Sequence, residues 1–140
     1  MFGVCGHSLQ DSSKEMNILH TFTIVLIILI GLEHVGIMGL ELLGSDRLIA
    51  KSFNLPLAEV ERPHLRTALA NQGLYNGFVA LSLFLIIFIP GGTLLRGMAI
   101  GLLAGIFIIA AYGALTVAKR ILWIQGAPAL ITMVLAMFFL

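Results

Sequence analysis

An acid and an imidazole, Glu33 and His34, stand side by side in the segment GLEHVGIM, directly after the apolar run TFTIVLIILI. A carboxylate and an imidazole can exchange a proton, hold a cation, or act together as general acid and base. Glu41 follows about two helical turns after Glu33, just beyond this segment. Because successive helical residues are rotated by about 100°, His34 and Glu41 are nearly aligned, and Glu33 lies within the same arc of about 100°. One face of this helix is therefore expected to be acidic and to carry an imidazole.

Three later apolar segments also carry polar side chains, each of them near one end of its segment. These residues are Asn71, Gln72, Tyr75, Asn76, Tyr112 and Gln125. If neighbouring segments run antiparallel, all of them lie in the same half of the membrane as Glu33. The opposite halves, such as LSLFLIIFI and ITMVLAMFFL, consist almost entirely of apolar and small residues. We therefore expect the polar residues to line one pocket together with Glu33, His34 and Glu41.

Several of these residues also have a purely structural interpretation. Amide side chains inside a membrane often only link helices, at about 0.6 kcal/mol each. This interpretation applies to Asn71, Gln72, Asn76 and Gln125. Tyr75 and Tyr112 suit the membrane interface, and Glu41 suits the headgroup boundary. The adjacent pair Glu33 and His34 is the hardest to explain in this way, because an ionisable group near mid-bilayer costs about 2.5 kcal/mol or more.

Composition indicates that the solvent around these residues is a bilayer. Of the 140 residues, 59% are apolar and 11% charged, whereas about 25% are charged in an average soluble domain. Four apolar blocks are each long enough to cross about 30 Å of hydrocarbon. They cover residues 18–43, 67–89, 97–118 and 121–140. Because backbone groups in lipid must be satisfied within their own segment, the blocks predict an all-α, four-helix, up-and-down membrane bundle.

This bundle is expected to form a single domain, residues 16–140, with one long loop at residues 44–66. Residues 1–15 are polar and lack the apolar core of a signal peptide, so we expect a flexible tail, with Met16 as an alternative start. The loop mixes apolar residues with charges of both signs, which favours a short amphipathic segment lying over the pocket.

Several classes of site and partner are disfavoured. A net charge of +1 argues against nucleic-acid binding, and a single cysteine, Cys5, excludes an intrachain disulfide. The sequence contains no phosphate-binding loop, paired CxxC, HExxH or nucleophile elbow. Side chains of adjacent helical residues diverge by about 100°, and those two turns apart are separated by about 10 Å, so Glu33, His34 and Glu41 do not predict a metal site. No cofactor is indicated.

Three glycines in the third block, Gly97, Gly101 and Gly105, recur at every fourth position. Small residues at this spacing allow two helices to approach closely. The partner is either a neighbouring helix of the bundle or a second copy of the chain, which would make a homo-oligomer through the third helix.

The distribution of basic residues predicts the orientation in the membrane. Four spans place Lys14 and Arg96 on one side of the bilayer. The opposite side carries Arg47, Lys51, Arg62, Arg66, Lys119 and Arg120. The positive-inside rule therefore places the loop 44–66 and the turn 119–120 in the cytoplasm, with both termini outside the cell membrane.

The segments LEH, ANQGLYNG, AYGALTVAKRIL and QGAPAL, in this order, resemble a family of small bacterial four-span membrane proteins catalogued as domain of unknown function thirteen-oh-four. The resemblance covers about residues 18–140. It implies the fold and the membrane location but no established activity. The chain reads VGIMGL where the family tends to have more aromatic residues, so an aromatic pocket wall is not implied.

Three functions remain open on these observations. The first, which we favour, is binding or transport of a cation or a small amphipathic ligand, with Glu33 as the exchangeable site. The second is a membrane enzyme that uses Glu33 and His34 as acid and base on a lipid-like or quinone-like substrate. The third is an accessory subunit whose polar core only fixes the register of its helices.

Overall fold

The structure, a computed structural model, describes the backbone of residues 3–140 and the side chains of residues 13–140. In this part of the chain every regular element is a helix. The elements are α1 (Gly3–Leu43), α2 (Asp46–Phe53), α3 (Leu57–Val60), α4 (Pro63–Ile86), α5 (Thr93–Thr116), the π-helix η1 (Leu122–Gly126) and α6 (Ala127–Phe139). Most of the tail expected at residues 1–15 lies outside the residues whose side chains are described.

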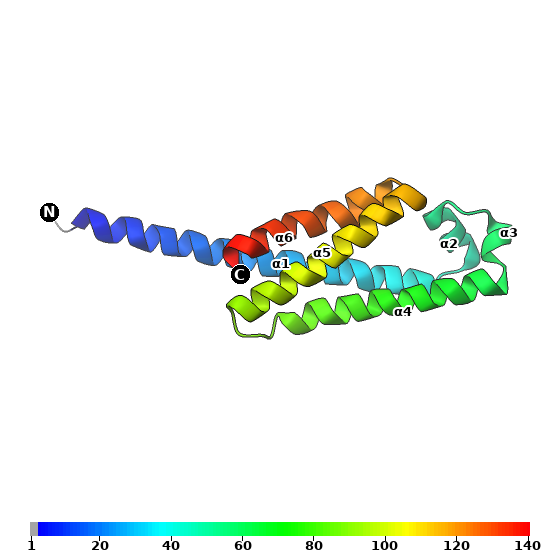
Figure 1. The fold of residues 1–140 in the computed structure, drawn as a ribbon, viewed down its shortest axis with the longest axis horizontal. Coiled ribbons are helices and arrows are strands. Elements are labelled where there is room, and N and C mark those ends of the chain that lie inside the picture. The colour runs from blue at the N-terminus through cyan, green and yellow to red at the C-terminus, as the bar shows by residue number, and fades with distance from the viewer. Residues whose placement is uncertain (1–2) are drawn as a thin grey trace.

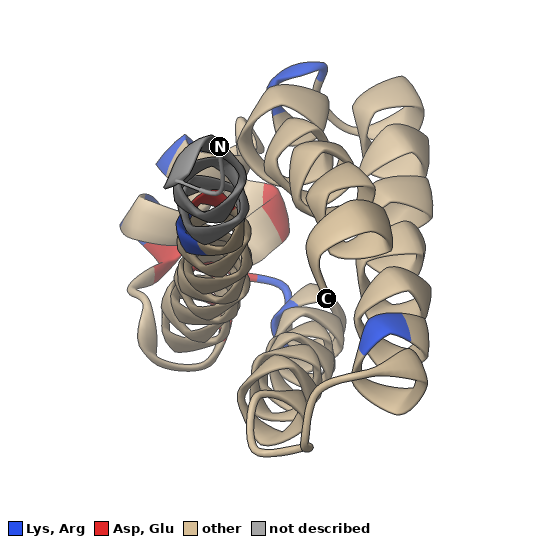
Figure 2. Cartoon of the chain, turned by 90° about the vertical axis from the view of Figure 1, so that its left-hand side faces the viewer, with Lys and Arg blue, Asp and Glu red and all other residues tan. Residues whose placement is uncertain are grey.

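Four stretches of the described chain are long and apolar enough to cross a membrane. They are Ser13–Leu43, Pro63–Ile86, Thr93–Thr116 and Leu122–Phe139. The four long helices run alternately in opposite directions, in the order α1, α4, α5 and η1–α6 (Figure 1). Viewed from one end, they carry few charged residues along their lengths (Figure 2). The prediction of an all-α bundle is confirmed, and the chain has the form of a multi-pass membrane protein.

Helix α1 packs most extensively on α4, which lies antiparallel beside it (Figure 1). The buried residues of α1 recur at alternating spacings of three and four, the pattern of a helix that faces a partner along its length. They are Thr23, Ile27, Ile30, His34 and, seven residues further on, Glu41; Gly31, next to Ile30, is buried as well. His34 and Glu41 therefore continue the line of buried positions that the two isoleucines begin.

Two glycines of α4 allow this close packing. A β-carbon added at Gly73 would lie 3.1 Å from Cβ of Glu41 and 3.3 Å from the carbonyl oxygen of Met38. One added at Gly77 would lie 2.5 Å from Sδ of Met38. Gly73 and Gly77 thus form the small-xxx-small contact of this bundle.

The glycines that sequence analysis selected for such a contact lie elsewhere. A β-carbon added at Gly97, Gly101 or Gly105 would meet no atom of the described part of the chain within 4 Å. The expectation that this series brings α5 close to a neighbouring helix of the bundle is therefore wrong, because it faces away from the other helices. Contact of this face with a second copy of the chain stays a prediction.

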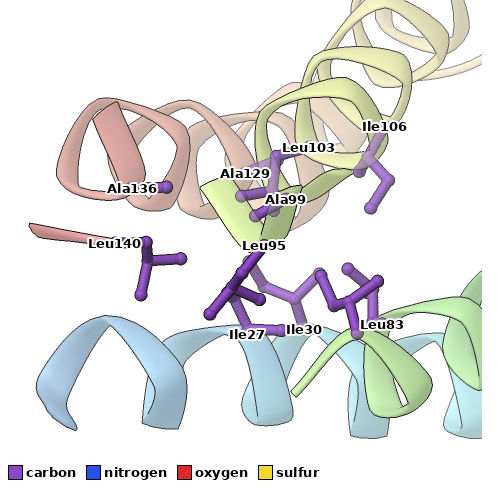
Figure 3. Close-up of a cluster of buried hydrophobic side chains, with 11 residues drawn as sticks. Ile27, Ile30, Leu83, Leu95, Ala99, Leu103, Ile106, Ala129, Ala136 and Leu140 are labelled. Carbon is purple, nitrogen blue, oxygen red and sulfur yellow. The ribbon is translucent and has the colours of Figure 1, made fainter. Parts of the chain in front are cut away.

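The main apolar core joins α1, α4, α5 and α6 toward the end of the bundle that holds the C-terminus. In Figure 3, Leu95 of α5 reaches Ile27 of α1, and Leu140 points toward the same helix. Alanines such as Ala99 and Ala129 are fully buried in this core. Their small size lets α5 and α6 approach closely, so this half of the bundle is filled with hydrocarbon.

The opposite end, which carries α2, α3 and the turn between α5 and η1, is called the loop end below. Here the loop predicted to be amphipathic forms α2, which Ser45 caps by accepting a hydrogen bond from the N–H of Leu48 at 3.4 Å. Ile49 of α2 and Val60 of α3 are fully buried in a small core of their own. The loop is thus a folded layer against the ends of the long helices.

Arg66, in the first turns of α4, attaches this layer to α1. Its guanidinium donates to the carbonyl oxygens of Glu41 and Gly44, both at 3.1 Å, and pairs with the Asp46 carboxylate at 3.2 Å. A cation at the carboxyl end of a helix satisfies terminal carbonyls and interacts favourably with the helix dipole. Arg66 therefore fixes the end of α1 relative to α2 and α4.

Candidate functional site

A cavity of about 290 Å³ lies at the loop end of the bundle. Three elements and one turn contribute its walls: α1, α2, η1 and the turn between α5 and η1. Its lining residues are Glu33, Ile37, Leu40, Ser52, Phe53, Val117, Ala118, Arg120, Ile121, Ile124 and Gln125. Most of these side chains are apolar, and four of them carry polar groups. The loop layer contributes Ser52 and Phe53, so α2 covers part of the cavity, as the amphipathic loop sequence predicted.

Among the residues whose side chains are described, Glu33 supplies the only carboxylate of this lining. Its Oε1 atom is buried and has no hydrogen-bond partner among the described residues. Buried polar atoms in folded proteins nearly always have such a partner, and leaving one unsatisfied costs about 1–3 kcal/mol, more for a charged group. The isolated oxygen of Glu33 therefore marks the cavity as a place where a hydrogen-bond donor or a cation would be stabilised.

The wall opposite α1 is an irregular helix. In η1 the N–H of Ala127 donates to the carbonyl oxygen of Leu122, the five-residue spacing of a π-helix. Pro128 follows at once and has no N–H to donate to the preceding turn. Such π-turns are rare and occur frequently at functional sites. Here the turn presents Ile124 and Gln125 to the cavity, so Gln125, a predicted site residue, does line the same space as Glu33.

Glu41 belongs to a second polar cluster, away from the cavity. Its side chain is 3% exposed, and Oε2 accepts a hydrogen bond of 2.7 Å from Nδ2 of Asn76 on α4. The same Asn76 amide donates to the backbone oxygen of Gln72 at 3.2 Å. Glu33 and Glu41 are eight residues apart on α1, so their side chains point about 80° apart around the helix axis. Glu33 and Glu41 therefore face different neighbours. The polar residues expected to line one pocket instead form two separate groups, one in the cavity and one around Glu41 and Asn76.

His34 is likewise absent from the cavity lining. Its ring is 4% exposed, and Nδ1 donates to the carbonyl oxygen of Ile30 at 2.9 Å. The residue lies in the buried line of α1 that faces α4. Adjacent residues of a helix point about 100° apart, and this rotation places His34 and Glu33 in different surroundings.

Four further residues expected in the pocket lie on the outside of the helices. They are Asn71, Gln72, Tyr75 and Tyr112. Tyr75 and Tyr112 are each 69% exposed, and Trp123 is 73% exposed. All three lie toward the loop end, where amphipathic aromatic rings suit the boundary between hydrocarbon and headgroups. The interfacial interpretation of the two tyrosines fits their positions, whereas the pocket interpretation does not.

Three polar or aromatic residues of the cavity were not predicted from the sequence: Ser52, Phe53 and Arg120. Their contribution depends on how α2 folds back and on the tight turn before η1. The available signals were the amphipathic pattern around Ser52 and the position of Arg120 directly after the third apolar block. In the described residues, no group of three or more His, Cys, Asp or Glu side chains is close enough to hold a metal ion.

Comparison with known proteins gives a family. A family described as "Protein of unknown function (DUF1304)" matches residues 28–137, which is most of the chain. The chain belongs to the DUF1304 family. It is also similar to a protein named "Uncharacterized protein YpaA" from Lactococcus lactis subsp. lactis (strain IL1403), with 36% identity over 117 residues, 83% of this chain and 97% of the relative. No solved structure matches the chain.

The part of the chain that matches the DUF1304 family contains both polar clusters. It begins within α1, before Glu33, and ends within α6, after Gln125. The amino-terminal part of α1, residues 3–27, lies outside the match. The cavity residues and the Glu41–Asn76 contact thus lie within the part of the chain that matches the DUF1304 family.

Proposed function

We propose that this protein binds, and moves across or within the membrane, a small amphipathic ligand whose cationic or hydrogen-bond-donating group is held by Glu33. The observation that carries the proposal is the buried, unpartnered Oε1 atom of Glu33 in a cavity whose walls are mostly apolar. Ligand sites typically combine such apolar walls with a few convergent polar groups. A volume of about 290 Å³ suits a small molecule rather than a lipid chain.

An ionisable residue inside a membrane-spanning helix supports a role in moving the ligand or a proton. Such residues are costly to insert and commonly mark ion and substrate pathways. The irregular η1 helix opposite Glu33 resembles in kind the interrupted helices that line transporter sites. The enzyme alternative is weaker, because among the described residues the cavity lining contains no histidine beside Glu33 to complete an acid and base pair. The accessory-subunit alternative is favoured by one observation, the Glu41–Asn76 bond that links α1 to α4.

The Glu33→Gln variant tests the binding function. Glutamine keeps the shape of the side chain and removes its charge. Titration calorimetry with the protein in neutral-lipid nanodiscs compares hexylammonium, as a small amphipathic cation, with hexanol. We expect the wild type to bind hexylammonium at least ~10-fold more tightly than hexanol, because one partly desolvated ion pair contributes on the order of 1.4 kcal/mol or more. Glu33→Gln should fold normally and lose this preference.

Two results would contradict the proposal. Equal affinities of wild type and Glu33→Gln for hexylammonium would remove the role of Glu33. Absence of amine binding by a well-folded wild type would favour the accessory-subunit function. A transport step is checked separately, by pH-dependent uptake of the same amine into proteoliposomes with wild type and Glu33→Gln side by side.

The orientation of the bundle is a further part of the proposal. The loop end carries six of the eight Lys and Arg residues, so the positive-inside rule favours a cytoplasmic position for it. A reporter fused after Leu140 should therefore be active outside the cytoplasm, and one inserted in the loop between α2 and α3 should be active inside. A cytoplasmic C-terminal reporter would reverse the side on which the cavity lies.

A further inference from the structure

We propose that the cavity receives a ligand charged at both ends, with an ammonium group at Glu33 and a carboxylate or similar anion at Arg120. This inference rests on the proposed function and specifies the class of ligand. It starts from two residues of opposite charge, Glu33 on α1 and Arg120 in the turn before η1, that line the same mostly apolar space.

These two charges do not neutralise each other. The ion pairs within 4.0 Å among the described residues are Arg62 with Glu59 and Arg66 with Asp46, so neither Glu33 nor Arg120 takes part in one. Opposite charges attract more strongly near apolar walls than in water. Because they are not paired with each other, the Glu33 carboxylate is available to bind a cationic group of a ligand and the Arg120 guanidinium an anionic group.

The order of the lining residues along the helices places the two groups at different depths. Along α1 the lining runs from Glu33 to Leu40, a rise of about 10 Å toward the loop end. The chain of η1 runs the other way (Figure 1), so Gln125 is the deeper and Arg120 the shallower of its polar contributions. Most of the other lining side chains are apolar, with Ile37 of α1 and Ile121 of the turn among them. A ligand with a short hydrocarbon spacer between an ammonium and a carboxylate matches this order.

The turn itself offers a matched control. Lys119 precedes Arg120, carries the same charge, is likewise exposed, and does not line the cavity. If Arg120 only adds to the basic character of the loop end, the two residues should be interchangeable. If Arg120 binds the ligand, only its replacement should matter.

The experiment measures affinities of three six-carbon probes, hexylammonium, 6-aminohexanoate and hexanoate, for protein in phosphatidylcholine nanodiscs. The proteins are wild type, Glu33→Gln, Arg120→Gln and Lys119→Gln, each checked for folding by thermal unfolding. We expect wild type to bind 6-aminohexanoate about 10-fold more tightly than hexylammonium, a difference of about 1.4 kcal/mol. Arg120→Gln should abolish this difference, Lys119→Gln should keep it, and Glu33→Gln should weaken both amines.

The possible failures separate this inference from the proposed function. Glu33-dependent binding of hexylammonium with no tighter binding of 6-aminohexanoate would overturn the two-charge ligand and leave the amine site in place. Equal losses in Arg120→Gln and Lys119→Gln would assign the effect to general surface charge and overturn the role of Arg120. Failure of both amines to bind would overturn both proposals together.

Discussion

Replacing Gly73 with leucine is expected to destabilise the bundle by about 3 kcal/mol, the upper end of the usual cost of overpacking, because the neighbours here include backbone. The first carbon of the new side chain would already lie 3.1 Å from Cβ of Glu41, 3.1 Å from Cγ of Leu42 and 3.3 Å from the carbonyl oxygen of Met38. The remaining carbons would have to push α4 away from α1. Since α1 packs most extensively on α4, this separation affects the main contact of the fold. Thermal unfolding in detergent, followed by helical circular dichroism, measures the loss.

Gly101→Leu is the matched control, with the same substitution in another membrane-spanning helix. No atom of another helix among residues 13–140 lies within 4 Å of a β-carbon at Gly101, so the stability of the single chain should be nearly unchanged. If the Gly97–Gly105 face contacts a second copy, Gly101→Leu should instead reduce the oligomer seen by light scattering while the monomer stays folded. Equal destabilisation by Gly73→Leu and Gly101→Leu would refute the assignment of the close contact to α4.

The number and approximate positions of the candidate membrane spans could be predicted from the sequence because they depend on length and apolar content, although three of the four spans begin four or five residues earlier than expected. The block expected at residues 97–118 corresponds to Thr93–Thr116, and the block at 121–140 to Leu122–Phe139. A bilayer imposes the same requirement on every segment, whatever its neighbours. Packing partners follow a different rule, since they depend on which face of each helix meets which neighbour.

The glycines illustrate this limit. Gly73 and Gly77 have the same four-residue spacing as Gly97 and Gly101. Spacing alone cannot distinguish a face that meets another helix from one that meets lipid. In the segment NQGLYNG the amide side chains were expected to line the pocket. Its two glycines, Gly73 and Gly77, instead make the close contact with α1. The helix rotation that decides this is set by the whole bundle.

The candidate site was predicted in part for the same reason. Depth in the membrane follows from position along a helix, so Glu33 and Gln125 were correctly expected in the same half of the bundle. Rotation about each helix axis then separated Glu33 from His34 and Glu41. Arg120 could not be placed in the cavity from sequence, because its position depends on the turn and on the extra residue per turn in η1.

Asn76→Ala is expected to lower the stability of the protein without emptying the cavity. The substitution removes the donor that lies 2.7 Å from Oε2 of Glu41, a residue that is 3% exposed. A buried acceptor left without its partner costs about 1–3 kcal/mol, and more when it is charged. The expected loss is therefore at the upper end of this range, measured by thermal or denaturant unfolding. Hexylammonium affinity should stay within about 2-fold of wild type, because Asn76 does not line the cavity.

Two comparisons make this prediction specific. Asn71→Ala removes the same side chain from an exposed position of the same helix and should change stability by less than about 0.5 kcal/mol. Combining Asn76→Ala with Glu41→Ala removes both partners, and the double variant should lose less stability than the two single losses added together, because no buried acceptor is then left unpaired. A stable Asn76→Ala protein that no longer binds hexylammonium would instead join the two polar clusters into one site. Lower stability with intact hexylammonium binding would be the opposite outcome. It would show that Glu41 and Asn76 connect α1 to α4, and that the ligand binds in the cavity around Glu33.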